Sequence, residues 1–96
     1  MLTLDPTSCA VGIIISKGKF SSLRGFPKFR MDSTDEELID RVVQAFGVPK
    51  YKHKDGWVTV LTGQRALEFG WTVYPYMTSK VKQQIMGMRL AAAAGS

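Results

Sequence analysis

The residues of this chain with the clearest chemical potential are cations spaced along predicted strands. Lys28 and Arg30 alternate with apolar residues, and Lys50, Lys52 and Lys54 alternate again further along. Because side chains two residues apart on a strand share one face, each set predicts a row of positive charge. Such a row repels itself unless an anion lies opposite, which suits nucleic-acid phosphates. The same patterns also occur on the solvated face or the protected edge of an ordinary sheet.

The sequence offers little material for enzyme chemistry. His53 is the only histidine and shows no pattern with a Cys, Ser or carboxylate partner that would make it a catalytic base, and Cys9 is the only cysteine. These counts exclude an internal disulfide and a Cys/His zinc cluster. We therefore expect no catalytic residue, no metal and no cofactor. One alternative stays open, namely a metal-dependent DNA endonuclease whose ion is held by acids such as Asp32 or Asp55.

Length and composition favour one small domain with an anionic partner. The 96 residues are 45% hydrophobic and carry a formal net charge of +5, enough for one core and biased toward nucleic acid. We expect a single domain over 1–90, with 91–96 (AAAAGS) as a tail or an expression scar. Short, interrupted apolar stretches and an opening MLTLDPTS without a basic start predict a soluble, cytoplasmic protein with no membrane partner.

The elements that must position the cations can be read from caps, turns and apolar spacing. The first half predicts a helix over 6–16 capped by Asp5, and then strands over 19–23 and 27–32 around an Arg24-Gly25 turn. A helix follows, opened by a Ser33–Glu36 capping box and closed by Gly47, and then strands over 50–54 and 57–61 around an Asp55-Gly56 turn. The chain ends with a helix capped by Thr62 and broken by Pro75, and with a last helix capped by Thr78 or Ser79. This order predicts an α+β domain.

The stretch AVGIIISKG, from Ala10 to Gly18, resembles the signature of the LAGLIDADG homing endonuclease family. WVTVLTGQRALEF and YPYMTSKVKQQIM resemble the family's second hairpin with its following helix and its Pro-Tyr turn, so the resemblance spans residues 5–89. It implies an αββαββα domain whose antiparallel sheet forms a saddle over DNA. It also implies a homodimer built on the first helix, with an interface of Ser8, Val11, Gly12, Ile15 and Ser16.

The chain departs from the family at the acidic positions of the signature, which are Ile15 and Lys17 here. In active members the second acid holds the divalent metal, whereas an ammonium group supplies only hydrogen-bond donors and a like charge. The resemblance therefore implies a degenerate, catalytically inactive member in which Lys17 neutralises a phosphate instead. Lys80 matches the lysine that follows the family's Pro-Tyr turn.

These observations together predict an inactive LAGLIDADG-like protein that binds duplex DNA as a homodimer, such as a regulator or a phage-encoded factor. The expected DNA contacts are Lys17, Lys19, Arg24, Lys28, Arg30, Lys50, Lys52, Lys54 and Lys80. A second alternative stays open, in which the same fold serves as an interaction module for a host or phage protein.

Overall fold

The structure is a computed structural model that describes residues 6–94. The proposed cap Asp5 lies outside the described residues. The elements are α1 (Pro6–Lys17), β1 (Lys19–Leu23), β2 (Phe26–Ser33), α2 (Glu36–Phe46), β3 (Tyr51–His53), β4 (Gly56–Thr62), α3 (Gln64–Val73), the 3₁₀ turn η1 (Tyr74–Tyr76) and α4 (Ser79–Ala94). The predicted order of helices and hairpins is confirmed. Within this part of the chain, no helix is long and apolar enough to cross a membrane.

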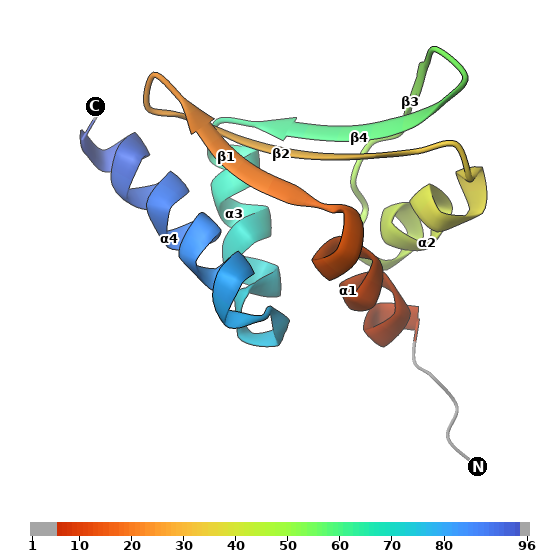
Figure 1. Cartoon of the computed structure of the whole chain (residues 1–96), viewed down its shortest axis with the longest axis horizontal. Coiled ribbons are helices and arrows are strands. Elements are labelled where there is room, and N and C mark those ends of the chain that lie inside the picture. The colour runs from red at the N-terminus through yellow and green to blue at the C-terminus, as the bar shows by residue number, and fades with distance from the viewer. Residues whose placement is uncertain (1–5, 95–96) are drawn as a thin grey trace.

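The four strands form one antiparallel sheet in the order β1-β2-β4-β3. All four α-helices lie on one side of this sheet (Figure 1). The two hairpin turns lie at opposite ends of the sheet and curve away from the helices. The sheet therefore has a helix-covered face and a concave open face. The predicted α+β class is confirmed.

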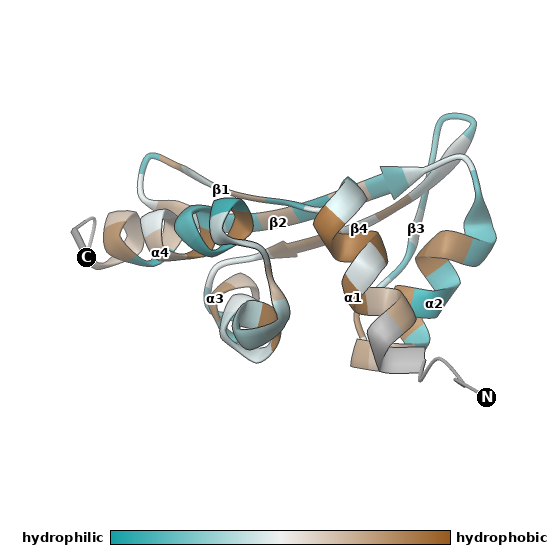
Figure 2. Cartoon of the chain, turned by 60° about the horizontal axis from the view of Figure 1, so that its bottom comes forward, coloured by the Kyte–Doolittle hydropathy of each residue, from teal (hydrophilic) through white to brown (hydrophobic). Residues whose placement is uncertain are grey.

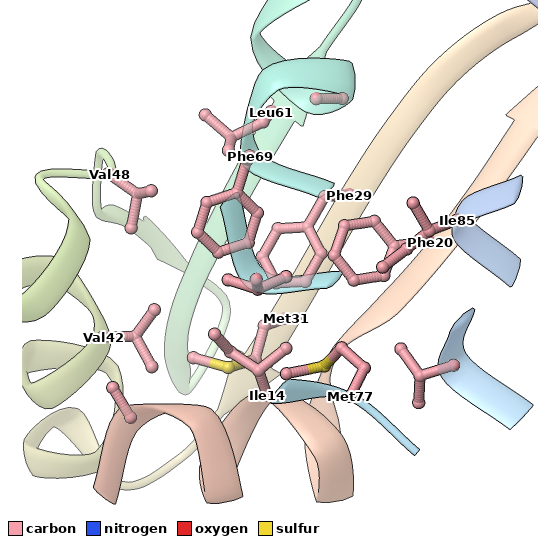
Figure 3. Close-up of a cluster of buried hydrophobic side chains, with 14 of the residues drawn as sticks. Ile14, Phe20, Phe29, Met31, Val42, Val48, Leu61, Phe69, Met77 and Ile85 are labelled. Atoms are coloured by element: carbon pink, nitrogen blue, oxygen red, sulfur yellow. The ribbon is translucent and has the colours of Figure 1, made fainter. Parts of the chain in front are cut away.

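The core lies between the sheet and the helices. In β2 the buried side chains alternate, with Phe29 and Met31 fully buried toward the helices. The ring of Phe29 lies 4.7 Å, centroid to centroid, from the rings of both Phe20 and Phe69, and these rings meet at the centre of the cluster in Figure 3. Burying three aromatic side chains supplies a large share of the hydrophobic stabilisation of so small a domain. The alternation also directs the intervening residues of β2 toward the open face.

The caps of α2 differ in part from the prediction. Asp35, not Ser33, is the N-cap: its carboxylate accepts a hydrogen bond from the Glu37 amide at 3.0 Å. Ser33 instead accepts a hydrogen bond from the Asp35 amide at 3.0 Å and so shapes the approach to the helix. The predicted end at Gly47 is confirmed, in the left-handed conformation (φ 67°) that favours glycine.

The second hairpin turns one residue earlier than predicted, at Lys54 and Asp55, and β3 is shorter than expected. Gly56 is the first residue of β4, and a Cβ there would lie 2.6 Å from the Ser33 carbonyl oxygen. The glycine is therefore needed where β4 passes close to another segment, and not for the turn itself.

The second half of the chain shows two further differences. The N-cap of α3 is Gly63, not Thr62, and the Gly63 amide donates a hydrogen bond to the Pro27 carbonyl at 3.0 Å. Residues 91–94, expected to be a tail, continue α4. A run of alanine is the strongest helix-forming composition, so this extension follows from propensity.

Candidate nucleic-acid interface

The β1–β2 hairpin carries a cluster of cations on the open face. Lys19 lies directly opposite Arg30 in the strand register, and Ser21 lies opposite Lys28. These residues alternate with the buried Phe20 and Phe29, so they lie on the face that no helix covers. Two cations directly opposite each other destabilise a sheet. This arrangement is therefore suited to a bound anion.

One acidic residue accompanies this cluster. The Arg30 guanidinium lies 3.7 Å from the Asp32 carboxylate, and both side chains are exposed. An exposed pair at this separation contributes little free energy. Arg30 is consequently free to exchange this partner for a phosphate or a base.

The two hairpin turns hold cations in an unfavourable backbone conformation. Arg24 (φ 53°) and Lys54 (φ 52°) are the non-glycine residues with positive φ in the part of the chain that the structure describes. For an ordinary L-residue this conformation costs roughly 1–2 kcal/mol, whereas glycine or asparagine adopts it readily. The turns stand at opposite ends of the concave face (Figure 1), so a cation is presented at each end at the expense of fold stability.

The lysines around β3 do not form the single row that the sequence predicted. Lys50 precedes β3, and its ammonium donates hydrogen bonds of 2.7 Å to Asp40 and Glu36 on α2. The hydrogen bond to Asp40, followed by that to Glu36, raises the pKa of Lys50. Lys52 lies opposite Trp57 in the register, and its ammonium is 4.7 Å from the centroid of that ring.

Because Trp57 packs against the core, Lys50 and Lys52 face the helical layer and not the concave face. The expectation that they share a face with Lys54 is therefore corrected: Lys54 lies in the turn, and the acids of α2 hold Lys50 in place. Tyr51 and His53 occupy the open side of β3 instead.

A hollow of about 480 Å³ lies between the end of β2 and the β3–β4 turn. Its lining includes Arg30 and Lys54, the acids Asp32 and Asp55 of the nuclease alternative, and His53. Sequence reasoning did not select His53 as a contact, although its alternation with Lys52 within one strand placed it on the face opposite to that lysine. Nowhere in residues 6–94 do three His, Cys, Asp or Glu side chains gather closely enough to hold a metal ion.

The helix α1 has a buried side and an apolar outer side. Ala10 and Ile14 are fully buried. Of the residues expected at the dimer interface, Val11 and Ile15 are half-buried and pack in part against the core, and Gly12 and Ser16 are exposed. The side chain of Ser8 lies outside the described residues. Whereas α2 carries both hydrophobic and hydrophilic colours in Figure 2, hydrophobic and near-neutral colours alternate along α1. Such a helix is typical of an element with a further partner.

The end of α1 brings Lys17 to the start of the sheet. A Cβ on Gly18 would lie 2.8 Å from the Ile14 carbonyl oxygen and 2.8 Å from the Phe29 ring. Only glycine allows the chain to turn here so close to β2. As a result, the exposed Lys17 lies only two residues before Lys19 of the open-face cluster.

Lys80 lies apart from the other predicted contacts. It is exposed in the first turn of α4, at the end of the helical layer remote from the sheet (Figure 1). The structure therefore gathers Lys19, Arg24, Lys28, Arg30 and Lys54 around the open face and its two turns, places Lys17 at the end of α1 next to β1, and leaves Lys50, Lys52 and Lys80 on the helical side. No family model, curated protein or solved structure matches the chain.

Proposed function

We propose that this protein binds duplex DNA as a homodimer, through the concave face of its sheet, without cleaving it. The observation that supports this most is the cation cluster of the β1–β2 hairpin on a face that no helix covers, with Lys19 directly opposite Arg30. Phosphate contacts from such a cluster would supply most of the affinity. A two-stranded ribbon fits the major groove, where an arginine such as Arg30 can bond to guanine.

The proposed dimer rests on α1 and on the resemblance of its sequence to the LAGLIDADG signature. Gly12 and Ser16 are small and exposed, so a second helix can approach closely, while Val11 and Ile15 supply apolar contact. Pairing two copies through α1 would double the number of cations available to one duplex. Lys17 stands where active members of that family have a metal-binding acid, which favours binding without hydrolysis.

Charge reversal on the open face tests this proposal. We expect Lys28→Glu to weaken binding to a mixed-sequence duplex by about tenfold or more at low salt, because a phosphate contact becomes a repulsion. The matched control is Lys82→Glu, which makes the same change of charge on α4 in the helical layer. Fluorescence anisotropy with labelled DNA would report both affinities, and thermal unfolding would show that both variants fold. Equal losses in the two variants would contradict a concave-face interface.

A further inference from the structure

The tip of the β1–β2 hairpin exposes two large apolar side chains. Leu23 is 73% exposed and Phe26 is 62% exposed, and the two residues are direct cross-strand partners. The strand register places them in line with Lys19 and Lys28 on the open side of the sheet. At this end of the sheet Phe26 also lines a hollow that extends to Leu67 of α3 and Ala92 of α4. Exposed apolar side chains that are paired in this way commonly mark a contact surface.

The apolar pair is held in a fixed position. The two residues between its members, Arg24 (φ 53°) and Gly25 (φ 78°), both have the positive φ of a tight two-residue hairpin turn. The Phe26 ring also rests near the end of β4: a Cβ placed on Gly63 would lie 3.8 Å and 3.9 Å from its Cε1 and Cζ atoms. A rigid apolar surface loses little conformational entropy when it binds.

The surroundings of the pair indicate what would cover it. Arg24 lies within the turn, and Lys28 lies two residues beyond Phe26 on the same strand face. A partner must therefore combine dense negative charge with small apolar groups that this pair can reach. The major groove of duplex DNA does so, since the C5-methyl group of thymine projects between phosphate-lined walls.

We propose that Leu23 and Phe26 contact thymine C5-methyl groups in the major groove and so favour A·T-containing sequences. This inference rests on the proposed DNA binding. Removing the methyl groups from the DNA would weaken binding by about fourfold for each methyl that the pair buries. Adding a methyl group at C5 of cytosine would strengthen binding by a similar factor.

The experiment compares four duplexes by fluorescence anisotropy at one salt concentration: alternating dA·dT, alternating dA·dU, and alternating dG·dC with and without 5-methylcytosine. We expect the native protein to prefer the methylated member of each pair. The double variant Leu23→Ser, Phe26→Ser should lose both preferences. The control Leu90→Ser changes a similarly exposed residue on α4 (63%) and should keep them.

The possible outcomes separate this inference from the proposal on which it depends. Binding of all four duplexes with no methyl preference would overturn the thymine contact and leave DNA binding intact; the apolar pair would then serve a protein partner. A methyl preference that persists in the double variant would also overturn it, because other residues would be responsible. Failure to bind any duplex would overturn DNA binding itself, and the thymine contact with it.

Discussion

At the scale of single residues, the most informative feature is the pair of cations in the hairpin turns. Arg24 and Lys54 both have a positive φ, although glycine or asparagine would fit these positions at lower cost. Strained residues of this kind tend to occur where function demands a particular side chain. We therefore expect the positive charge at each turn to serve binding, at the expense of stability that a single substitution could recover.

This argument predicts opposite effects of one substitution on stability and on binding. Lys54→Asn should raise the free energy of unfolding by about 1 kcal/mol, because asparagine tolerates the left-handed conformation. The same variant should bind DNA more weakly, because one phosphate contact is lost. Urea unfolding and fluorescence anisotropy would measure the two effects.

The matched control for Lys54→Asn is Lys52→Asn, which removes a charge from the same hairpin at a position facing the helical layer. It should not gain stability and should change DNA affinity less. Lower stability of Lys54→Asn than of the native protein would show that the turn lysine is not strained, and unchanged DNA affinity would show that it makes no phosphate contact.

At the scale of elements, α1 combines a buried side with an outer side whose apolar residues are half-buried. Gly12 lies on the outer side, and a Cβ there meets no atom within 4 Å; Gly87 on α4 is equally open. In an isolated chain, leucine at either position would therefore be accommodated and would favour the helix by up to about 1 kcal/mol. Leucine at Gly12 and leucine at Gly87 should therefore have different effects only if another molecule approaches α1.

We accordingly expect Gly12→Leu to yield a folded monomer and Gly87→Leu to remain a dimer. Sedimentation equilibrium would give the oligomeric state, and circular dichroism would confirm that both variants are folded. A native protein that is monomeric at high concentration, or a Gly12→Leu variant that still dimerises, would contradict pairing through α1.

The sequence predicted most elements because their signals are local. Apolar alternation in β2 indicated that Phe29 and Met31 are buried, and Gly47 marked the end of α2. The second hairpin was predicted less well because tertiary contacts decide it. Gly56 is required by the approach of the Ser33 carbonyl, and Lys50 is held by Asp40 and Glu36, which lie 10 and 14 residues away.

The candidate interface was predicted in part for the same reason. The β1–β2 cations follow from alternation within one hairpin, so Lys28 and Arg30 were placed together correctly on one strand face. The face occupied by Lys52 depends on the packing of Trp57 against the core, and the distance of Lys80 from the sheet depends on how α4 lies in the helical layer. The spacing of residues along the chain predicts neither the face of Lys52 nor the position of Lys80.

At the scale of the whole molecule, charge is distributed unevenly between the two sides of the sheet. The formal net charge is +5. Acidic residues are concentrated in the first turns of α2, where Glu36 and Asp40 pair with Lys50, whereas the charged residues on the open face of β1 and β2 are Lys19, Lys28, Arg30 and Asp32. We therefore expect the open face, and not the side of α2, to attract an approaching polyanion.

The most direct test of this account is the affinity of the native protein for mixed-sequence duplex DNA across a salt series, with and without magnesium, followed by gel analysis of the DNA. Five cations, Lys19, Arg24, Lys28, Arg30 and Lys54, in each of two copies predict that log affinity falls with log salt with a slope of about −9. Binding should not require magnesium, and the DNA should stay intact. No binding at low salt would contradict the account, as would magnesium-dependent cleavage that Asp32→Ala abolishes.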